Sequence, residues 1–448
     1  MASLSPPSFI TFFFFFSAFL FHSSHQTLYS PITKDNFTNL YTLLIYLKTP
    51  PQPSKLHLDL GNYLPWYDCV RHYKKSSSYK PVYSNSSLCT DIAPGLYTSC
   101  IYPQGPGCFN DSCGFFPENP VSRKSATGSL LIDKFALPIT TKPGPGPVSE
   151  LVFACTDNTS YAKMYRGLAK GSAGLAAMGR FKYSLPAQVS RAFSSPQVFA
   201  VCLPGSSVAP GVALFNSPGP YYFSPGIDIS KSLTYTRLIL GPTGADTEIY
   251  HEYKSPDYNL ELTSFRVNKR VVHLNQTLLS IDENGKGGTK LSTSTPYTLL
   301  QTSIYNALVD AFVKESAVLN LTTTIPVEPF SIEPFSVCFA ADKVRSTRLG
   351  PFVPTIDLVL GNNNNNKVVW RIYGSNSMVR IQNFGFDGWC LGFLDGGLNP
   401  STSIVIGGHQ LEDNLLQFDL ERQRLGFSSS LLFYSTTCAN LGFSATKN

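Results

Sequence analysis

The chain has 448 residues, of which 43% are hydrophobic and only 14% charged. This composition excludes a disordered protein and supplies a large core, in one bilobal unit or in two to three domains. Its 33 Gly and 33 Pro residues favour short strands joined by tight turns, so we predict a mainly β protein. The net charge is +6, but Lys and Arg are scattered, which argues against nucleic-acid binding. An anionic cell wall or an acidic protein partner is compatible with this charge.

The N-terminal segment carries an apolar run from Phe9 to Phe21. A run of about 13 residues fits the hydrophobic region of a secretory signal and is too short to span a bilayer comfortably. A buried strand or a short anchor is the alternative. We therefore predict a signal peptide at residues 1–25, cleaved between residues 21 and 26, and a secreted, extracellular protein without a membrane anchor.

Cysteines and glycosylation sequons follow this segment in numbers that agree with secretion. An even count of ten cysteines in an oxidising compartment predicts disulfides, whereas the close group at 89 to 113 lacks the paired C-x-x-C spacing of a metal site. We expect no metal and no cofactor. The cysteines are Cys69, Cys89, Cys100, Cys108, Cys113, Cys155, Cys202, Cys338, Cys390 and Cys438. The sequons are at Asn36, Asn85, Asn110, Asn158, Asn275 and Asn320.

Two segments far apart in the chain have the same local layout. The first, "LYTLLIYLKTPPQPSKLHLDLG", predicts a strand, a Pro-Pro turn and a second strand that ends at Asp59. The second, "GGTKLSTSTPYTLL", predicts a Gly-Gly turn and a short strand, followed by a helix over "TSIYNALVDAFVKESA" with Thr302 or Ser303 as its N-cap.

A second pair of landmarks strengthens the case for an internal duplication. Apolar stretches lead into Gly179 in "GLAAMG" and into Gly407 in "SIVIGG". Asp59 lies 120 residues before Gly179, and Ser292 lies 115 residues before Gly407. Near-equal spacing in two halves predicts two lobes with one internal layout. We place the first lobe at residues 26–220 and the second at 235–448, joined through a Pro/Gly-rich stretch.

At this point the residues resemble a known family. The segments "LHLDLG", "ATGSLLIDKFALP", "GLAAMGR" and "IVIGGHQLEDNLLQFDLERQRLGF" resemble the pepsin-like aspartic proteases from end to end. More closely, "CGFFPENP", "STSTPYTLLQTSIYNAL", "GSNSMV" and "TTCAN" are similar to the plant branch that contains extracellular dermal glycoprotein, basic 7S globulin and the xylanase and endoglucanase inhibitors. This resemblance implies a bilobal fold with two β-rich lobes around a cleft.

The resemblance also implies that the catalytic machinery is altered. Aspartic proteolysis needs two carboxylates about 3 Å apart that share one proton, each in an Asp-Thr/Ser-Gly triplet. The matching triplets here are Asp59-Leu60-Gly61 and Ser292-Thr293-Ser294, and Ser125 stands where the flap carries a Tyr. Because Ser does not ionise in this pH range, Asp59 and Ser292 mark the positions of a vestigial catalytic dyad. We expect no proteolytic activity, and we expect Asp59 to titrate like an isolated acid.

The family pattern also implies disulfide pairs. Cys202 would pair with Cys438, Cys338 with Cys390, and Cys69 with Cys155. The group from Cys89 to Cys113 would form two further bridges in one of three arrangements.

The function that the resemblance implies is a secreted plant defence protein of the apoplast that binds and inhibits a microbial xylanase or xyloglucan-specific endoglucanase. The alternatives are a storage or receptor-like binding protein without an enzyme target, and a residual aspartic endopeptidase. The segments that match the basic inhibitory loops, 318–326 and 396–403, contain no Lys or Arg, so Arg345 and Arg348 are the candidate substitutes. We expect Trp66, Trp370 and Trp389 to lie in the core, with carbohydrate stacking by one of them as the alternative.

Overall fold

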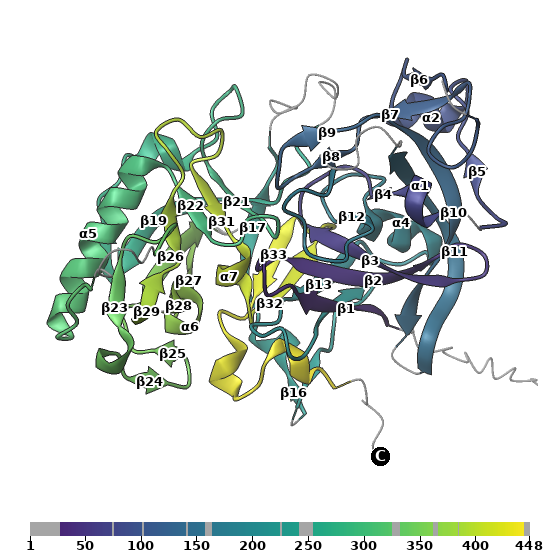
Figure 1. The fold of residues 1–448 in the computed structure, drawn as a ribbon. Helices are drawn as coiled ribbons and strands as arrows, with labels where there is room; N and C mark the ends of the chain where they lie inside the picture. The colour runs from purple at the N-terminus through teal and green to yellow at the C-terminus, as the bar shows by residue number, and fades with distance from the viewer. Residues whose placement is uncertain are drawn as a thin grey trace, which may run out of the picture.

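Two β-rich lobes lie side by side, with the N-terminal half of the chain in one and most of the C-terminal half in the other (Figure 1). The structure is a computed structural model, and it describes residues 27–442 except 74–75, 101–102, 140–141, 157–163, 225, 242–253, 325–331, 362–365 and 384. The predicted signal peptide and Asn158 lie outside the described residues. The expectation of a mainly β, bilobal protein is confirmed.

Within the described residues, the first lobe is built from mostly short strands, the two long strands β10 (Gly128–Ile139) and β11 (Lys142–Thr156), and three short helices. Its strands are β1 (Leu28–Lys34), β2 (Tyr41–Leu47), β3 (Gln52–Asp59), β4 (Trp66–Tyr67), β5 (Lys80–Pro81), β6 (Tyr97–Thr98), β7 (Ser112–Phe115), β8 (Glu118–Asn119), β9 (Lys124–Ser125), β10 (Gly128–Ile139), β11 (Lys142–Thr156), β12 (Gly174–Ala177), β13 (Val198–Cys202) and β14 (Gly211–Phe215). Its helices are α1 (Cys69–His72), α2 (Ser87–Ile92) and α4 (Leu185–Ala192). A small hairpin of β15 (Tyr222–Phe223) and β16 (Ile227–Asp228) and the 3-10 helix η2 (Ile229–Ser232) follow in the connection.

The second lobe has the same character, with one long helix on its outer side (Figure 1). Its strands are β17 (Thr234–Ile239), β18 (Asn259–Leu260), β19 (Leu262–Val267), β20 (Arg270–Val272), β21 (Thr289–Leu291), β22 (Thr298–Leu300), β23 (Cys338–Ala340), β24 (Ser346–Thr347), β25 (Gly350–Pro351), β26 (Ile356–Gly361), β27 (Lys367–Ile372), β28 (Met378–Asn383), β29 (Phe386–Leu391), β30 (Phe393–Asp395), β31 (Ile404–Ile406), β32 (Leu415–Asp419) and β33 (Arg424–Phe427). Its helices are α5 (Thr302–Val318), α6 (Gly374–Ser377) and α7 (Gly408–Leu411), with 3-10 turns η3 (Gln276–Leu279), η4 (Ala341–Lys343), η5 (Leu431–Tyr434) and η6 (Cys438–Asn440).

An antiparallel sheet joins the two lobes. In the first half of the chain β1 pairs with β14 and β14 with β13, and in the second half β17 pairs with β33 and β33 with β32. The halves meet where β13 pairs with β32, from Val198 opposite Asp419 to Cys202 opposite Leu415. Almost every side chain of these two strands is buried, so the lobes share one continuous core.

The internal repeat that the spacing predicts is present. β3 pairs in parallel with β12, with Asp59 opposite Ala177, and β21 pairs in parallel with β31, with Leu291 opposite Ile406. In each half, therefore, a glycine follows the second strand of the parallel pair, and its backbone lies very close to a neighbouring segment of the chain. A Cβ on Gly179 would lie 2.7 Å from the carbonyl oxygen of Gly61, and one on Gly407 would lie 2.4 Å from that of Tyr297, which leaves room only for glycine.

Five disulfides join the ten cysteines. The three pairs that the resemblance implies are formed, Cys202–Cys438, Cys338–Cys390 and Cys69–Cys155. Of the three open arrangements in the remaining group, the structure has Cys89–Cys113 and Cys100–Cys108. The five sequon asparagines within the described residues are all exposed.

The helix predicted after the second repeat is present as α5, but its expected N-cap was wrong. Gln301 occupies the cap position, and its side-chain oxygen accepts hydrogen bonds from the backbone N–H groups of Ser303 and Ile304. Thr302 instead donates its hydroxyl to Asp395. Within the described part of the chain, no helix combines the length and apolar character needed to cross a membrane.

Candidate functional site

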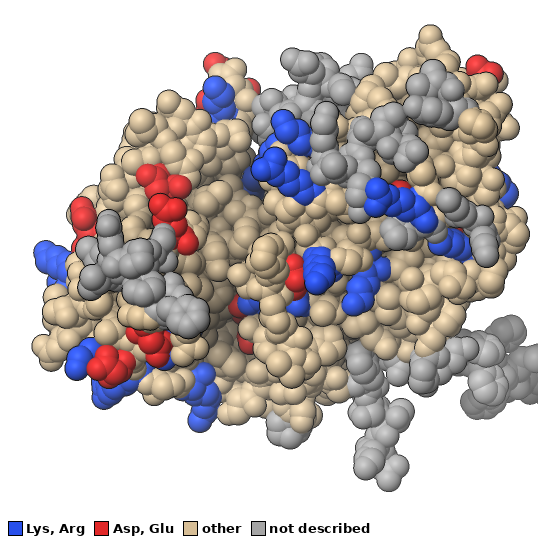
Figure 2. Space-filling view, viewed as in Figure 1, with Lys and Arg blue, Asp and Glu red and all other residues tan. Residues whose placement is uncertain are grey.

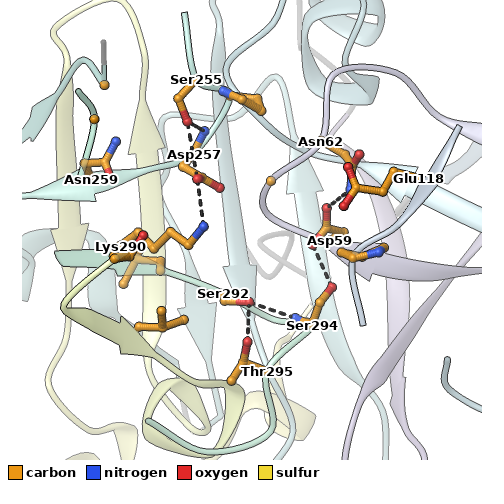
Figure 3. A pocket seen from close by; sticks show the side chains of 18 of the residues that line it. Asp59, Asn62, Glu118, Ser255, Asp257, Asn259, Lys290, Ser292, Ser294 and Thr295 are labelled. Carbon is orange, nitrogen blue, oxygen red and sulfur yellow. Dashed lines mark hydrogen bonds and ion pairs between the residues drawn. The ribbon is translucent and has the colours of Figure 1, made fainter. Parts of the chain in front are cut away.

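The two repeat ends face one another across a cleft between the lobes (Figure 3). A pocket of about 170 Å³ lies there, with Asp59 and Asn62 on the first-lobe side and Asp257, Lys290 and Ser292 on the second-lobe side. The sequence expectation that Asp59 and the triplet at Ser292 line one site agrees with this geometry.

Both carboxylate oxygens of Asp59 are held by neutral donors. Ser294 donates its hydroxyl to Oδ1 at 2.6 Å, and the Asn62 amide donates to Oδ2 at 2.8 Å (Figure 3). His57 lies behind Ser294, with Nε2 at 2.9 Å from the Ser294 oxygen. Because Ser294 gives its own proton to Asp59, we assign the His57 proton to Nε2. Nδ1 is then an unprotonated nitrogen, and it has no hydrogen-bond partner among the described residues.

Burial controls the titration of this cluster. Asp59 is only 3% exposed, and burial raises the pKa of its carboxyl above the ordinary value, while the hydrogen bonds from Ser294 and Asn62 offset part of the rise. Burial also lowers the pKa of His57 to about 3, so this imidazole is neutral at physiological pH. The expectation that Asp59 titrates like an isolated acid was therefore wrong, because it left out the cost of burying the charge.

The Asp59 partner is Ser294 and not Ser292. The Ser292 hydroxyl pairs with that of Thr295 at 3.1 Å, and it also accepts the backbone N–H of Ser294 at 3.3 Å. Ser294 lies in the bend that follows β21, and from there its side chain reaches the space that faces Asp59. In the triplet of an active protease this position is a glycine. The serine side chain thus fills the site beside the inner oxygen of the remaining carboxylate.

One half of the link between the two triplets is intact. The Thr293 hydroxyl donates to the carbonyl oxygen of Leu58 at 2.8 Å and accepts the backbone N–H of Leu60 at 3.1 Å. The reciprocal link would need a hydroxyl on residue 60, where a fully buried Leu side chain packs into the core instead. Of this reciprocal pair of links, only the one made by Thr293 is therefore present.

A second carboxylate does enter the cleft, but it belongs to an ion pair. Asp257 Oδ2 lies 2.9 Å from Lys290 Nζ, and both side chains are largely buried (Figure 3). A Cβ on Gly61 would lie 3.0 Å from Asp257 Oδ1 and 3.5 Å from Asp59 Oδ2, so this glycine makes room between the two acids. No hydrogen bond joins the two carboxyl groups among the described residues, so Asp257 does not supply the proton-sharing partner that Ser292 lacks.

The flap is a small hairpin over the cleft. β8 pairs with β9, with Glu118 opposite Ser125, and the Trp66 indole donates to the Glu118 carbonyl from below. Ser125 is exposed, and it brings no aromatic ring or phenol hydroxyl to the cleft. Arg123, at the turn of this hairpin, lines the pocket and pairs with Glu118 at 3.6 Å.

Sequence reasoning missed four residues of this site: His57, Asn62, Asp257 and Lys290. It named Ser294 as part of the second triplet but did not predict its contact with Asp59. Asn62 could have been found from the first triplet, since it lies three residues beyond Asp59. Asp257 and Lys290 carry no local signal, because their pairing arises only when β18 and β21 lie side by side. In the described residues, no group of three His, Cys, Asp or Glu side chains has the arrangement of a metal site.

The fold and this site define a pepsin-like protein. Of the two positions that carry the catalytic aspartates in that fold, only one is acidic here. Two family descriptions cover most of the chain: Xylanase inhibitor N-terminal matches residues 41–217, and Xylanase inhibitor C-terminal matches residues 257–429. The chain belongs to this xylanase-inhibitor family of aspartic-protease-like proteins.

Similar proteins cover nearly the whole chain. "Probable aspartic proteinase GIP2" of Nicotiana benthamiana is 44% identical over 93% of this chain and 91% of its own length. "Gamma conglutin 1" of Prunus dulcis is 39% identical over 92% and 88%. The crystal structure of edgp has 42% identity and a TM-score of 0.84, covering 94% of this chain and 98% of its own, and that of basic 7S globulin from soybean has 29% identity and a TM-score of 0.75 over 93% and 99%.

Removing the Ser294 hydroxyl should raise the pKa of Asp59 further. In Ser294→Ala the carboxylate loses a hydrogen bond that favours its charged form, while its burial remains. Carbon-detected NMR titration of the Asp59 carboxyl measures the change. Ser292→Ala is the matched control and should leave this pKa in place, because the Ser292 hydroxyl bonds to Thr295. An equal shift in both variants would contradict the assignment of Ser294 as the partner.

Asp59 should also make stability fall as the pH rises. Its pKa is raised in the folded protein, so its contribution is most favourable below the unfolded pKa and is lost as the pH rises through the folded pKa. Asp59→Asn should therefore gain free energy of unfolding, relative to the unmodified protein, between pH 3 and pH 7 in urea denaturation. The exposed Asp310→Asn is the control. If the difference in free energy of unfolding between Asp59→Asn and the unmodified protein stays constant with pH, the Asp59 carboxyl titrates normally.

Proposed function

We propose that this protein is a secreted, non-proteolytic member of its family that binds and inhibits a microbial glycoside hydrolase, either a xylanase or a xyloglucan-specific endoglucanase. One observation supports the absence of proteolysis in this proposal. Ser294 and Asn62 each donate a hydrogen bond to one of the two carboxylate oxygens of Asp59. The inhibitory part is supported by the family descriptions, since both halves of the chain match those of xylanase inhibitors.

The chemistry of peptide hydrolysis explains why the filled site matters. An aspartic protease holds a water between two carboxyl groups, one of which must be ionised while the other is protonated. Ser292 offers a hydroxyl that does not ionise, Ser294 occupies the neighbouring space, and Asp257 is paired with Lys290. Loss of a general acid or base costs about 10²- to 10⁴-fold in rate, and more when the groups act as a unit.

An exposed arginine hairpin offers a means of binding a hydrolase cleft. β24 and β25 form a short hairpin that presents Arg345 and Arg348 to solvent. Arg345 lies over the Phe352 ring at 4.7 Å, whereas Arg348 has no ion pair within the described residues. Glycosidases work with two carboxylates in an open cleft, and a guanidinium can pair with such a carboxylate through two parallel hydrogen bonds. Arg348 is therefore our candidate for the residue that enters the target cleft.

The distribution of charge supports an extracellular, wall-associated protein. Residues 26–220 contain 17 Lys and Arg against 9 Asp and Glu, whereas residues 235–448 contain 17 against 19. Figure 2 shows Lys and Arg over both lobes and most of the visible Asp and Glu over the second lobe, so the asymmetry comes from the acidic residues. A basic first lobe would hold the protein on an anionic cell wall and leave the hairpin of the second lobe free. Five disulfides and exposed sequons fit the same oxidising, secretory route.

Charge reversal at the hairpin should weaken inhibition. Against a panel of secreted fungal xylanases and xyloglucan-specific endoglucanases, we expect the purified protein to inhibit at least one enzyme stoichiometrically. Arg348→Glu should weaken that complex by tenfold or more, about 1.4 kcal/mol, because it sets like charges against each other. Enzyme assays and isothermal titration calorimetry measure the effect.

Lys343→Glu is the matched control for this experiment. It makes the same charge change in the neighbouring turn η4, where Lys343 is exposed and pairs with Asp342. An equal loss in both variants would point to long-range charge and not to a contact by Arg348. Full enzyme activity at a large molar excess across the whole panel, with no complex on a sizing column, would refute inhibition of these enzymes.

A storage or receptor-like binding protein without an enzyme target is the second candidate. It is favoured by the similarity to proteins named gamma conglutin and basic 7S globulin, and by the absence of Lys and Arg from segments 318–326 and 396–403. The same enzyme panel separates the two candidates, because a storage protein leaves every hydrolase active.

A residual aspartic endopeptidase is the third candidate, in line with the name "Probable aspartic proteinase" of two relatives. We expect no cleavage of haemoglobin or casein between pH 3 and pH 6, with or without pepstatin. Pepstatin-sensitive cleavage that disappears in Asp59→Ala would overturn the non-proteolytic assignment.

A further inference from the structure

A second and larger cavity lies between the lobes, away from the cleft. We name it the inter-lobe groove, and it has a volume of about 690 Å³, within the ~300–1,000 Å³ typical of ligand sites. Lys34 and the segment 204–209 line it from the first lobe, α6, α7, β28 and β29 from the second, and residues 437–440 from the C-terminal segment. Figure 2 shows the surface hollowed between the lobes, where Figure 1 places α6 and α7. It shares no lining residue with the pocket at Asp59.

The charged groups of the inter-lobe groove are compensated within the protein. Glu412 at its base pairs with Lys34 at 2.5 Å and with His409 at 3.0 Å, and it accepts the Tyr41 hydroxyl at 2.6 Å. Arg380 at the rim pairs with Asp387 at 2.6 Å. The charged side chains named here are therefore already paired within the protein and do not favour a charged ligand.

Asp413 is the remaining acid of the groove. Its carboxylate accepts the backbone N–H of Cys438 at 2.9 Å. Burial raises the pKa of Asp413 to about 6, so the group is neutral in more acidic surroundings. The groove as a whole thus favours an uncharged ligand.

The groove combines aromatic rings with small polar side chains. Trp389 is half-buried in its wall, and the Arg380 guanidinium lies over one face of its ring, 5.0 Å from the ring centre. Tyr297 lines the same groove. No hydrogen bond to the Trp389 indole N–H is found in the described residues, although the group is not buried. Polar side chains of Ser206, Thr437 and Asn440 line the same space.

We infer that the inter-lobe groove binds a neutral oligosaccharide. A sugar ring presents an apolar C–H face and a rim of hydroxyl groups, which matches an indole beside hydroxyl, amide and N–H groups. The sugar ring packs against the part of the Trp389 indole that Arg380 leaves open, and the sugar hydroxyls bond to the polar side chains around it. The sequence expectation that Trp389 is a core residue was incomplete, because part of its indole faces the groove.

This site does not depend on hydrolase binding. The oligosaccharide has two sources with the same chemistry, a β-linked wall polysaccharide or the glycan of a glycoprotein. Binding is measured with the full-length, secreted protein alone, so its failure leaves the proposed inhibition untouched.

Tryptophan fluorescence offers a direct readout. The chain has three tryptophans, and Trp66 and Trp370 are 1% and 0% exposed, so only Trp389 can report on the groove. We expect a saturable change in emission with cellotetraose or xylotetraose if the source is a wall polysaccharide, and with tri-N-acetylchitotriose if it is a glycoprotein. Tetragalacturonate, the charged probe, should bind at least tenfold more weakly. No saturable change with any neutral probe, or equal binding of tetragalacturonate, overturns the proposal.

Two variants test the placement of the site. Trp389→Phe keeps an aromatic ring in the wall and should remove the fluorescence change, with about tenfold weaker binding in calorimetry. Ala209→Phe should block the groove while Trp389 is unchanged, and it should weaken binding equally. Tyr97→Ala, at a 71% exposed ring in the first lobe, is the control and should bind normally. Unchanged affinity in Ala209→Phe, with unfolding temperature intact, overturns the proposal.

Discussion

The ladder between β13 and β32 is the constraint on which both candidate sites depend. It joins strands from the two halves of the chain, and its buried side chains merge the two lobes into one core. The cleft at Asp59 and the inter-lobe groove both take residues from each lobe, so neither exists without this junction. A substitution such as Val201→Asp, at a fully buried position of β13, would therefore affect two separate surfaces together.

The sequence indicated the fold because the fold repeats. The strand that ends at Asp59 and its partner before Gly179 have a second copy at Ser292 and Gly407, and the parallel pairs β3–β12 and β21–β31 explain the near-equal spacing. The spacing of motifs along the sequence could not predict long-range packing. Asp257 and Lys290 meet only through neighbouring strands, and the residues of the inter-lobe groove are spread from 34 to 440. The state of Asp59 was missed because burial, which raises its pKa, is a tertiary property.

Under the proposal that this protein is non-proteolytic, the cleft has a structural role in place of a catalytic one. Thr293 still fastens the two triplets, and Asp59 remains, but the hydroxyl of Ser294 stands where an active enzyme needs open space. The carboxylate then acts as an acceptor that joins the lobes, with His57 as the far end of the chain of hydrogen bonds. This arrangement costs the burial of an acid, and it holds the cleft floor through hydrogen bonds from the Ser294 and Asn62 side chains.

The Cys202–Cys438 bond gives the molecule a covalent connection that does not follow the polypeptide order. The other four disulfides each lie within one lobe, so this bond alone ties the end of the chain back to β13. A protease that cut the connection near residues 221–233 would leave two fragments that stay attached and keep the β13–β32 ladder. Maturation into a two-chain protein is thus open to this fold without loss of either inter-lobe surface, because the Cys202–Cys438 bond would join the two chains covalently and the buried β13–β32 ladder would join them non-covalently.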